Sequence, residues 1–516
     1  MTKFENKAIS ASAGSGKTFR LAHRYMGLLA RGIPPDRICA LTFSRKAAGE
    51  IFDSIVRNLT RAAQNAQSAE RASKYMEAGP VPAGKFLAAL RCFLENLHGA
   101  NIGTIDSFIA AIIRAFPLEL GLNDLEFRLM DGDSADAESF REGIISAVCN
   151  SKHVNKTGTN IFLEVFKQAT LGAEKKTFTD NLNGFLSNYR AAFLRIPAED
   201  AWGNPARIWK QEPWWRPPPK APNGKELERI LQLILDNPGW DKRMPATMAK
   251  LINNLKDFDY DSEWAPDLFL DGAIQSQLIA KLDAPSQDGL TIQYARKEYL
   301  IPANVFKLLR ALYHNLFHVQ FNRLCQRTRG ILGVIAMYEK EYEQALLQTG
   351  RMTFTDAQLL LSPRGFASGG STISRCRQPQ DGRIFIDYRL DSRIDHWLLD
   401  EFQDTSNLQW QALENLLDEI LQDDSDTRSF FYVGDVKQTI YRWRGGNPDL
   451  FNSVLSRYGK KIINESLNKT QRSAQPIIDT VNRVFASLPE TQAKTSEPAI
   501  SRRVLLKWNS AWKEHE

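Results

Sequence analysis

A glycine-rich loop near the start of the chain constrains the fold more than any other feature. The loop reads Ala11, Ser12, Ala13, Gly14, Ser15, Gly16, Lys17 and Thr18. Between a buried strand and a helix, such a loop wraps its backbone N–H groups around a phosphate chain. The lysine then reaches the β- and γ-phosphates, and the hydroxyl holds Mg²⁺. The flanks fit, because residues 7–10 are a short apolar run and residues 18–29 place apolar side chains at helical spacing. The sequence therefore predicts a nucleotide phosphate site on an α/β layer.

Two acids far along the chain are candidates for the same site. Residues 396–399 are an apolar run that ends in Asp400 and Glu401. In a parallel sheet, the carboxyl end of such a strand lies beside the phosphate loop. Asp400 is suited to bind Mg²⁺ together with Thr18, and Glu401 to polarise the water that attacks the terminal phosphate. Successive side chains of a strand point to opposite faces, so both acids reach the site only if the strand ends there and the chain turns.

Aromatic and basic side chains alternate after the next predicted strand, at residues 430–433. Tyr441 and Trp443 are interleaved with Arg442 and Arg444. Aromatic rings stack on bases without sequence preference, and arginines hold phosphates. This pattern predicts a surface for single-stranded nucleic acid next to the nucleotide site.

The order of these motifs resembles that of the UvrD/Rep group of superfamily 1 DNA helicases, and more closely its RecB/AddA branch. Six motifs carry the resemblance, at residues 11–18, 41–51, 103–108, 400–406, 434–446 and 467–473. The RecB/AddA branch is favoured by Asp106, where UvrD itself would carry a histidine, and by the pair Lys437 and Gln438. The resemblance covers residues 1–120 and 350–490, and the middle of the chain is matched only by position.

The resemblance implies ATP and Mg²⁺ as cofactors and DNA, with a single-stranded 3′ tail or a duplex end, as the partner. It implies a catalytic set of Lys17, Asp400, Glu401, Gln438 and Arg472, in which Gln438 senses the γ-phosphate and Arg472 reaches it from a second motor domain. Thr18 and Asp400 are the implied metal ligands. The implied DNA contacts are Thr42, Phe43, Thr104, Ser107, Phe108, Tyr441, Trp443 and Arg444.

The chain departs from the family at several positions. Ala11 replaces the first glycine of the loop, and Gln471 replaces an aromatic residue expected to stack on adenine. No glutamine that could read adenine lies in the ten residues before Ala11. The two motifs that follow the sixth one in the family are not found, nor is the C-terminal nuclease pattern. We therefore expect this chain to bind nucleotide but to hydrolyse it slowly.

Length and spacing predict three parts. A chain of 516 residues is too long for one core. We expect a RecA-like parallel sheet from residues 1–120 and 350–459, and the beginning of a second RecA-like domain at residues 460–516. Between them, residues 121–349 form a mostly helical insert, with helical runs at residues 162–168, 227–235, 305–317 and 331–347. Further strands are expected at residues 37–43, 101–103 and 460–463, and further helices at 46–59, 107–116 and 474–485, with a polar stretch up to residue 84.

Composition narrows the class of protein. The net charge of +6 is compatible with nucleic-acid binding but is weak support for it. Five cysteines without paired spacing indicate reduced thiols rather than disulfides, zinc or an iron–sulfur cluster. No apolar run reaches membrane length and no signal-peptide core is found, so a cytoplasmic location is expected.

For three features of the insert, the sequence favours a structural role over a binding site. Trp214 and Trp215 lie in a proline-rich stretch that favours a rigid connector with packed indoles. His314 and His318 have the spacing of a metal pair but lack a third ligand nearby, which favours a structural role. Residues 339–343 have the charge pattern of a solvated helix face.

Three functions remain compatible with the sequence. The first is an ATP-dependent DNA helicase or translocase motor in repair or recombination. The second is a helicase–nuclease subunit, with the nuclease supplied elsewhere by the protein or by a partner subunit. The third is an ATP-gated DNA-binding regulator that does not unwind DNA.

Overall fold

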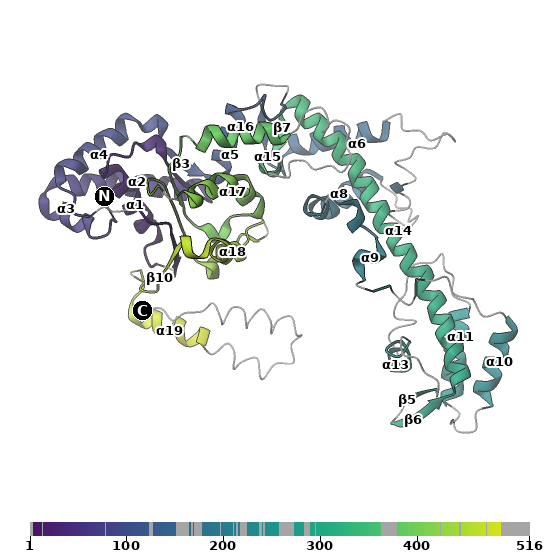
Figure 1. Ribbon diagram of the computed structural model, residues 1–516. Helices are drawn as coiled ribbons and strands as arrows, with labels where there is room; N and C mark the ends of the chain where they lie inside the picture. The colour runs from purple at the N-terminus through teal and green to yellow at the C-terminus, as the bar shows by residue number, and fades with distance from the viewer. Residues whose placement is uncertain are drawn as a thin grey trace. The chain divides into compact units, whose positions relative to one another are not determined.

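A computed structural model describes most of the chain and divides it into two compact units. Unit 1 is Met1–Glu142 with Glu343–Glu516, and unit 2 is Gly143–Tyr342 (Figure 1). The described residues are 4–486, apart from 13, 78, 123–126, 151–164, 167–168, 170–177, 197, 210, 213–214, 217–223, 237–239, 241–242, 257–272, 283–288, 295, 363–378, 392, 424, 443–444 and 471.

Unit 1 is built on a six-stranded parallel sheet with the strand order β10–β1–β9–β8–β2–β3. The strands are β1 (Lys7–Ala11), β2 (Ile38–Thr42), β3 (Asn101–Thr104), β8 (His396–Leu399), β9 (Ser429–Gly434) and β10 (Ile463–Leu467). Every residue of β2, β8 and β9 is buried, as expected for central strands of a parallel sheet that is covered on both faces. The predicted fold class, a RecA-like parallel sheet, is confirmed.

Helices pack on both faces of this sheet. One layer consists of α1 (Lys17–Ala30), α2 (Arg45–Gln64), α3 (Ala66–Ser73) and α4 (Ala83–Glu95). The other side holds α5 (Ile105–Ala115), α15 (Phe354–Leu361), α16 (Pro379–Asp391), α17 (Asn407–Gln422) and α18 (Asp449–Tyr458) (Figure 1). Successive side chains of β8 point to opposite faces of the sheet and pack against both helix layers. Leu398 joins the core under α1, α2 and α4, whereas Trp397 packs edge-on against Phe108 of α5. The polar stretch expected up to residue 84 instead contains α3 and the start of α4, which buries Phe86 and Phe93.

Strand β10 corrects one expectation. The strand predicted at the beginning of a second domain instead pairs in parallel with β1, with Lys7 opposite Ile463 and Ala11 opposite Leu467. Its amide and carbonyl groups thus complete the edge of the first sheet. Helix α19 (Gln475–Ala486) follows it, close to the predicted helix at residues 474–485.

Unit 2 is mostly helical, as predicted. Its main element is α14 (Ala303–Thr349), a single helix of 47 residues that contains both predicted runs at residues 305–317 and 331–347 and extends into unit 1. The N-terminal half of α14 shares an apolar core with α10 (Gly224–Leu235), α11 (Arg243–Lys256), α13 (Ala273–Ile279) and a hairpin of β5 (Leu290–Tyr294) and β6 (Lys297–Ile301). The described residues also include α6 (Ala135–Asn150), which crosses the unit boundary, α8 (Phe178–Arg195) and α9 (Pro205–Ile208). Unit 1 contains the paired strands β4 (Arg128–Met130) and β7 (Arg351–Thr353). The predicted run at residues 162–168 lies largely outside the described residues.

The expectation of a solvated face at residues 339–343 was wrong for two residues. The side chain of Glu339 is only 4% exposed and forms an ion pair with Arg190 at 2.5 Å. The guanidinium of Arg190 also lies 4.3 Å from the ring centre of Tyr342, which is buried. This pairing joins segments far apart in the sequence, so local charge pattern could not predict it.

Two of the aromatic and histidine residues singled out in unit 2, Trp215 and His318, make contacts within the fold. Trp215 is buried and packs against Trp209 and Phe321, as a connector with packed indoles would. His318 Nδ1 lies 2.9 Å from the carbonyl oxygen of Trp215. Among the described residues, no group of three or more His, Cys, Asp or Glu side chains forms a metal cluster, and no helix is long and apolar enough to cross a membrane.

His396, the first residue of β8, makes the sheet sensitive to acid. Burial, reinforced by Arg24 and Arg428, lowers its pKa from 6.5 to about 3. The unfolded chain therefore binds a proton here below pH 6.5, whereas the native protein does not do so until about pH 3. The contribution of the neutral imidazole to stability is complete above pH 6.5 and is lost on acidification by up to about 1.4 kcal/mol per pH unit.

We expect urea denaturation to show this fall in the free energy of unfolding between pH 6.5 and 4.5. The free energy of unfolding of the wild type should fall relative to that of His396→Asn as the pH is lowered. Taking the difference between the two proteins cancels the opposite contribution of acids whose pKa is raised. A difference that does not change with pH would contradict the assignment.

Candidate functional site

The phosphate loop is closed by its own hydrogen bonds. Ser15 donates to the carbonyl oxygen of Ser12 through both its backbone N–H, at 3.2 Å, and its Oγ, at 2.7 Å. Gly16 adopts φ +89°, a conformation that favours glycine, and α1 begins at the next residue, Lys17. The helix N-terminus thus faces the loop, where it favours an anion. Ala11 is tolerated in place of glycine because it ends β1 with its side chain in the core.

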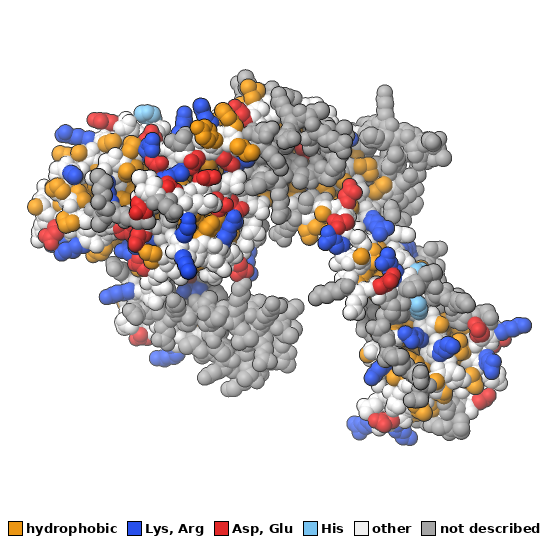
Figure 2. Space-filling model, viewed as in Figure 1, with side chains coloured by type: hydrophobic (Ala, Val, Ile, Leu, Met, Phe, Trp, Pro, Cys, Tyr) orange, Lys and Arg blue, Asp and Glu red, His pale blue; other side chains and the backbone are white. Residues whose placement is uncertain are grey.

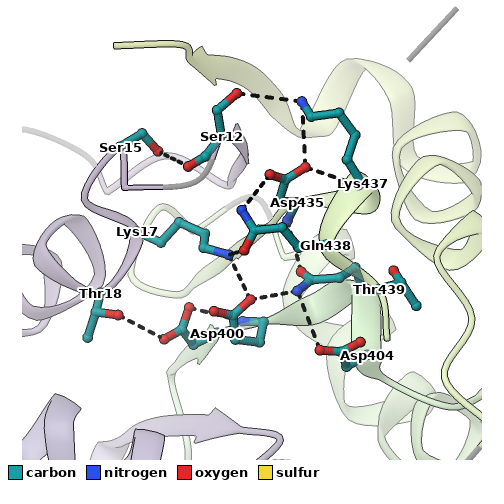
Figure 3. Close-up of polar contacts among 12 residues, drawn as sticks. Ser12, Ser15, Lys17, Thr18, Asp400, Asp404, Asp435, Lys437, Gln438 and Thr439 are labelled. Carbon is teal, nitrogen blue, oxygen red and sulfur yellow. Dashed lines mark hydrogen bonds and ion pairs between the residues drawn. The ribbon is translucent and has the colours of Figure 1, made fainter. Parts of the chain in front are cut away.

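The chain turns at the end of β8, which brings both acids to this loop. Asp400 N–H donates to the carbonyl oxygen of Leu41 at 2.8 Å, and Glu401 then adopts the left-handed conformation with φ 49°. This conformation costs a non-glycine residue about 1 kcal/mol. As a result, Lys17 Nζ lies 2.8 Å from Glu401 Oε2, and Thr18 Oγ1 lies 3.4 Å from Asp400 Oδ2 (Figure 3). The turn that the sequence analysis required is present.

Buried negative charge dominates the site. Asp400 is 2% exposed, and its pKa is raised to about 6 by burial and by Glu401, partly offset by Lys17. Burial and Glu401 also raise the pKa of Asp404 to about 6. A buried carboxylate beside a hydroxyl is a fitting pair of hard oxygen ligands for Mg²⁺, whose charge would relieve this excess. The donor set at Thr18 and Asp400 therefore fits the predicted ion.

The loop after β9 supplies a third side of the site. Gln438 accepts a hydrogen bond from Lys17 Nζ at 3.4 Å through Oε1 and donates to Asp435 Oδ2 at 2.7 Å through Nε2. Lys437 Nζ lies 3.5 Å from Ser12 Oγ of the phosphate loop (Figure 3). Sequence reasoning used Lys437 only to choose the branch of the family and did not predict its place beside this loop.

The sixth motif packs directly on the phosphate loop. A Cβ atom added to Gly14, at φ +73°, would lie 2.6 Å from Thr470 Oγ1 and 2.7 Å from Arg472 Cβ. The backbone of Arg472 therefore lies against the loop, directly after β10 of the first sheet. Its side chain is exposed. Gln471 and Ala13 lie outside the described residues.

We expect Gly14→Ala to weaken ATP binding by more than tenfold, because the methyl group must displace the segment at residues 470–472. Gly32→Ala is the matched control, since Gly32 has φ +88° but open space around its missing Cβ. Both variants carry the backbone strain of about 1 kcal/mol, and both should lower the melting temperature. Equal ATP affinities of the two variants, measured by equilibrium titration, would contradict the close contact.

The predicted DNA contacts separate into two groups. Phe43, just after β2, and Tyr441 lie together, with ring centres 4.6 Å apart and an interplanar angle of 31°. Ile440 beside them is 70% exposed. These rings lie at the carboxyl ends of the strands, where a platform for bases was predicted. Trp443 and Arg444 lie outside the described residues.

In the second group, the side chains of Phe108, Thr104, Ser107 and Thr42 are buried or make contacts within the domain. Phe108 is 9% exposed and its ring packs against Trp397, with ring centres 5.3 Å apart, so its contact with DNA stays a prediction. Thr104 and Ser107 form the capping box of α5, in which each side chain accepts a hydrogen bond from the other's backbone N–H. Thr42 is fully buried. The apolar side of α5 could have indicated the placement of Phe108, because Ile105, Ile109 and Ile112 share its helical face.

Comparison with known proteins agrees with this geometry. A family model described as the UvrD/REP helicase N-terminal domain matches residues 3–459. The chain belongs to this family. The UvrD/REP match covers every strand of the first sheet except β10, together with the whole of unit 2.

Curated relatives of the UvrD/REP domain point to the branch that the motifs favoured. The chain is 26% identical over 517 residues to a protein named as an ATP-dependent helicase/nuclease subunit, from Streptococcus equi subsp. zooepidemicus (strain H70). It is 25% identical over 508 residues to the protein of the same name from Streptococcus pyogenes serotype M1. Each match covers 94% of this chain but only 38% of the relative.

Proposed function

We propose that this chain is the ATP-binding part of an ATP-driven DNA helicase or translocase that acts on single-stranded or partly duplex DNA in repair or recombination. One observation carries the proposal. Lys17 and Thr18 from α1, Asp400 and Glu401 after β8, and Gln438 after β9 converge at the carboxyl ends of neighbouring parallel strands. Membership of the UvrD/REP family and the names of the relatives support the same function.

The geometry suggests how the residues divide the work. Thr18 and Asp400 would hold Mg²⁺, which supplies positive charge to the β- and γ-phosphate oxygens. Lys17 would leave Glu401 for the phosphates, and Glu401 would then orient the attacking water and accept its proton. Gln438 would detect the terminal phosphate, because it already contacts Lys17. Arg472 would reach the same phosphate from the neighbouring segment.

We propose that DNA binds over Phe43, Tyr441, Trp443 and Arg444, with movement from 3′ to 5′ as the family implies. Figure 2 shows acidic and basic side chains interspersed on the visible face of unit 1. We assign the affinity for DNA to stacking on the aromatic rings and to local phosphate contacts. The proposed parts are the motor domain at 1–120 with 350–467, which includes β10, the insert at 121–349, and a second motor domain that begins after β10.

The deciding experiment measures single-stranded DNA affinity of the full chain with and without Mg²⁺ and ATP. We expect ATP to change this affinity in the wild type and to have no effect on Lys17→Ala, which should still bind DNA. Equal affinities in the wild type with and without ATP would contradict a motor. An ATP effect without any strand separation would instead favour an ATP-gated regulator.

We further propose that hydrolysis by this chain alone is slow. DNA-stimulated turnover on the order of tens per second would contradict this. A helicase–nuclease subunit remains the second candidate, because the names of the relatives include a nuclease. Cleavage of DNA by a longer form or with a partner subunit, but not by this chain, would favour it.

A further inference from the structure

Gln403 contacts the carboxylates of Glu401 and Asp404. Neither the motifs nor the family resemblance gives it a role. Its side chain is 1% exposed. Nε2 donates to Glu401 Oε2 at 2.6 Å and lies 3.5 Å from Asp404 Oδ2. Oε1 accepts the backbone N–H of Asp435 at 2.9 Å. Both ends of the amide therefore form hydrogen bonds. Nε2 binds the loop after β8 that carries Glu401 and Asp404, called here the acid loop, and Oε1 binds the loop after β9.

These contacts close a ring of hydrogen bonds through the nucleotide site. Lys17 Nζ binds Glu401, Glu401 binds Gln403, and Gln403 binds the backbone of Asp435. Asp435 Oδ2 accepts from Gln438 Nε2 at 2.7 Å, and Gln438 Oε1 returns to Lys17 Nζ at 3.4 Å. When Lys17 turns to a phosphate, the ring opens at the lysine. Glu401 would then keep the donation from Gln403 as its fixed contact.

The loop after β8 and the loop after β9 contact each other at two places, the first at Gln403 and the second further along both loops. A Cβ atom added to Gly434 would lie 2.6 Å from Gln403 Oε1, so a glycine allows the close approach at the first contact. Further along, Asn447 N–H donates to the carbonyl oxygen of Thr405 at 3.0 Å, and Ser406 forms an isolated bridge with Gly446. The segment between these contacts carries Gln438 and Tyr441. Gln403 thus links Glu401 to the loop that carries the candidate DNA surface.

We propose that Gln403 is a positioning residue that orients Glu401 for hydrolysis and holds the loop after β9 to the acid loop. The proposal rests on the proposed ATPase function. An amide is suited to this place because it can donate to a carboxylate and accept from a backbone N–H at once. Methionine, of similar length, can do neither, and an ionised glutamate can only accept.

The test compares the full-length wild type with Gln403→Met and Gln403→Glu in single-turnover ATP hydrolysis and in equilibrium ATP binding. We expect the hydrolysis rate constant of both variants to fall at least tenfold, while the ATP dissociation constant stays within threefold. Gln403→Glu keeps the acceptor for Asp435 N–H and serves as the test if Gln403→Met does not fold.

The matched control is Asn415→Leu. Asn415 Nδ2 donates to Asp387 Oδ2 at 3.0 Å between α17 and α16, so this variant also loses one amide–carboxylate hydrogen bond in unit 1. Its hydrolysis rate should stay within twofold of the wild type. A wild-type rate in both Gln403 variants would overturn the positioning role alone. So would a loss of rate that is matched by the control or by an equal loss of ATP affinity. If the wild type does not bind ATP, the proposed function fails first.

Discussion

Glu401→Gln is expected to slow ATP hydrolysis by about 10²–10⁴-fold while ATP binding is kept or becomes tighter. The glutamine cannot accept the proton of the attacking water. In the wild type, Glu401 also binds Lys17 at 2.8 Å and so competes with the phosphates for this ammonium group. Removing that charge frees Lys17 for the nucleotide. Hydrolysis and binding should therefore respond in opposite directions, or binding should not respond at all.

Single-turnover hydrolysis and equilibrium ATP titration separate these two effects. Glu414→Gln is the matched control, because Glu414 of α17 forms its ion pair with Arg457 of α18 rather than with a residue of the phosphate loop. The control should hydrolyse and bind ATP as the wild type does. A Glu401→Gln protein that hydrolyses ATP at the wild-type rate would assign the catalytic carboxylate elsewhere.

Lys17→Ala should weaken ATP binding by about 100-fold, since hydrogen bonds to a charged group contribute up to about 3 kcal/mol. Lys17 is 10% exposed in its side chain and reaches Glu401 and Gln438, so its ammonium is already held where the terminal phosphates are expected. Little stability should be lost, because its partner Glu401 is 31% exposed and can be hydrated.

Equilibrium titration with a fluorescent ATP analogue measures the loss of affinity. Lys46→Ala is the control, because Lys46 lies within the second motif but its side chain is 88% exposed and its Nζ contacts Glu50 Oε1, at 3.9 Å. We expect wild-type affinity in Lys46→Ala. If both variants bind ATP equally well, the loop at residues 11–18 does not hold the phosphates.

Local sequence predicted the parts of this site that depend on a strand, a turn and a helix in succession. Apolar runs located β1, β8 and β9, and glycine spacing located the phosphate loop. The sequence predicted that Glu401 reaches the site only if the chain turns after β8. It could not predict the turn itself, which depends on the left-handed conformation of Glu401. The role of Gln403 depends on contacts with Asp435, which is remote in the sequence and reached only through sheet order.

Residues with two plausible environments were the hardest to place. Phe108 sits in a motif implied to bind DNA, yet its ring packs against Trp397. Glu339 has charged neighbours typical of a solvated face, but Arg190 buries it. Strand β10 was expected to begin another domain, and only its pairing with β1 shows which sheet it completes. Each of these outcomes depends on tertiary pairing rather than on local pattern.

The most direct test of the shared metal and nucleotide site is an ATP titration with and without Mg²⁺, on the wild type and on Asp400→Asn. If Thr18 and Asp400 hold the ion beside the phosphates, Mg²⁺ should tighten ATP binding to the wild type by about tenfold or more. This corresponds to about 1.4 kcal/mol. Asp400→Asn should bind ATP in the absence of Mg²⁺ but should lose the increase. An equal Mg²⁺ effect in the two proteins, or ATP binding to neither, would contradict the convergence of the loop and the strand-end acids on one site.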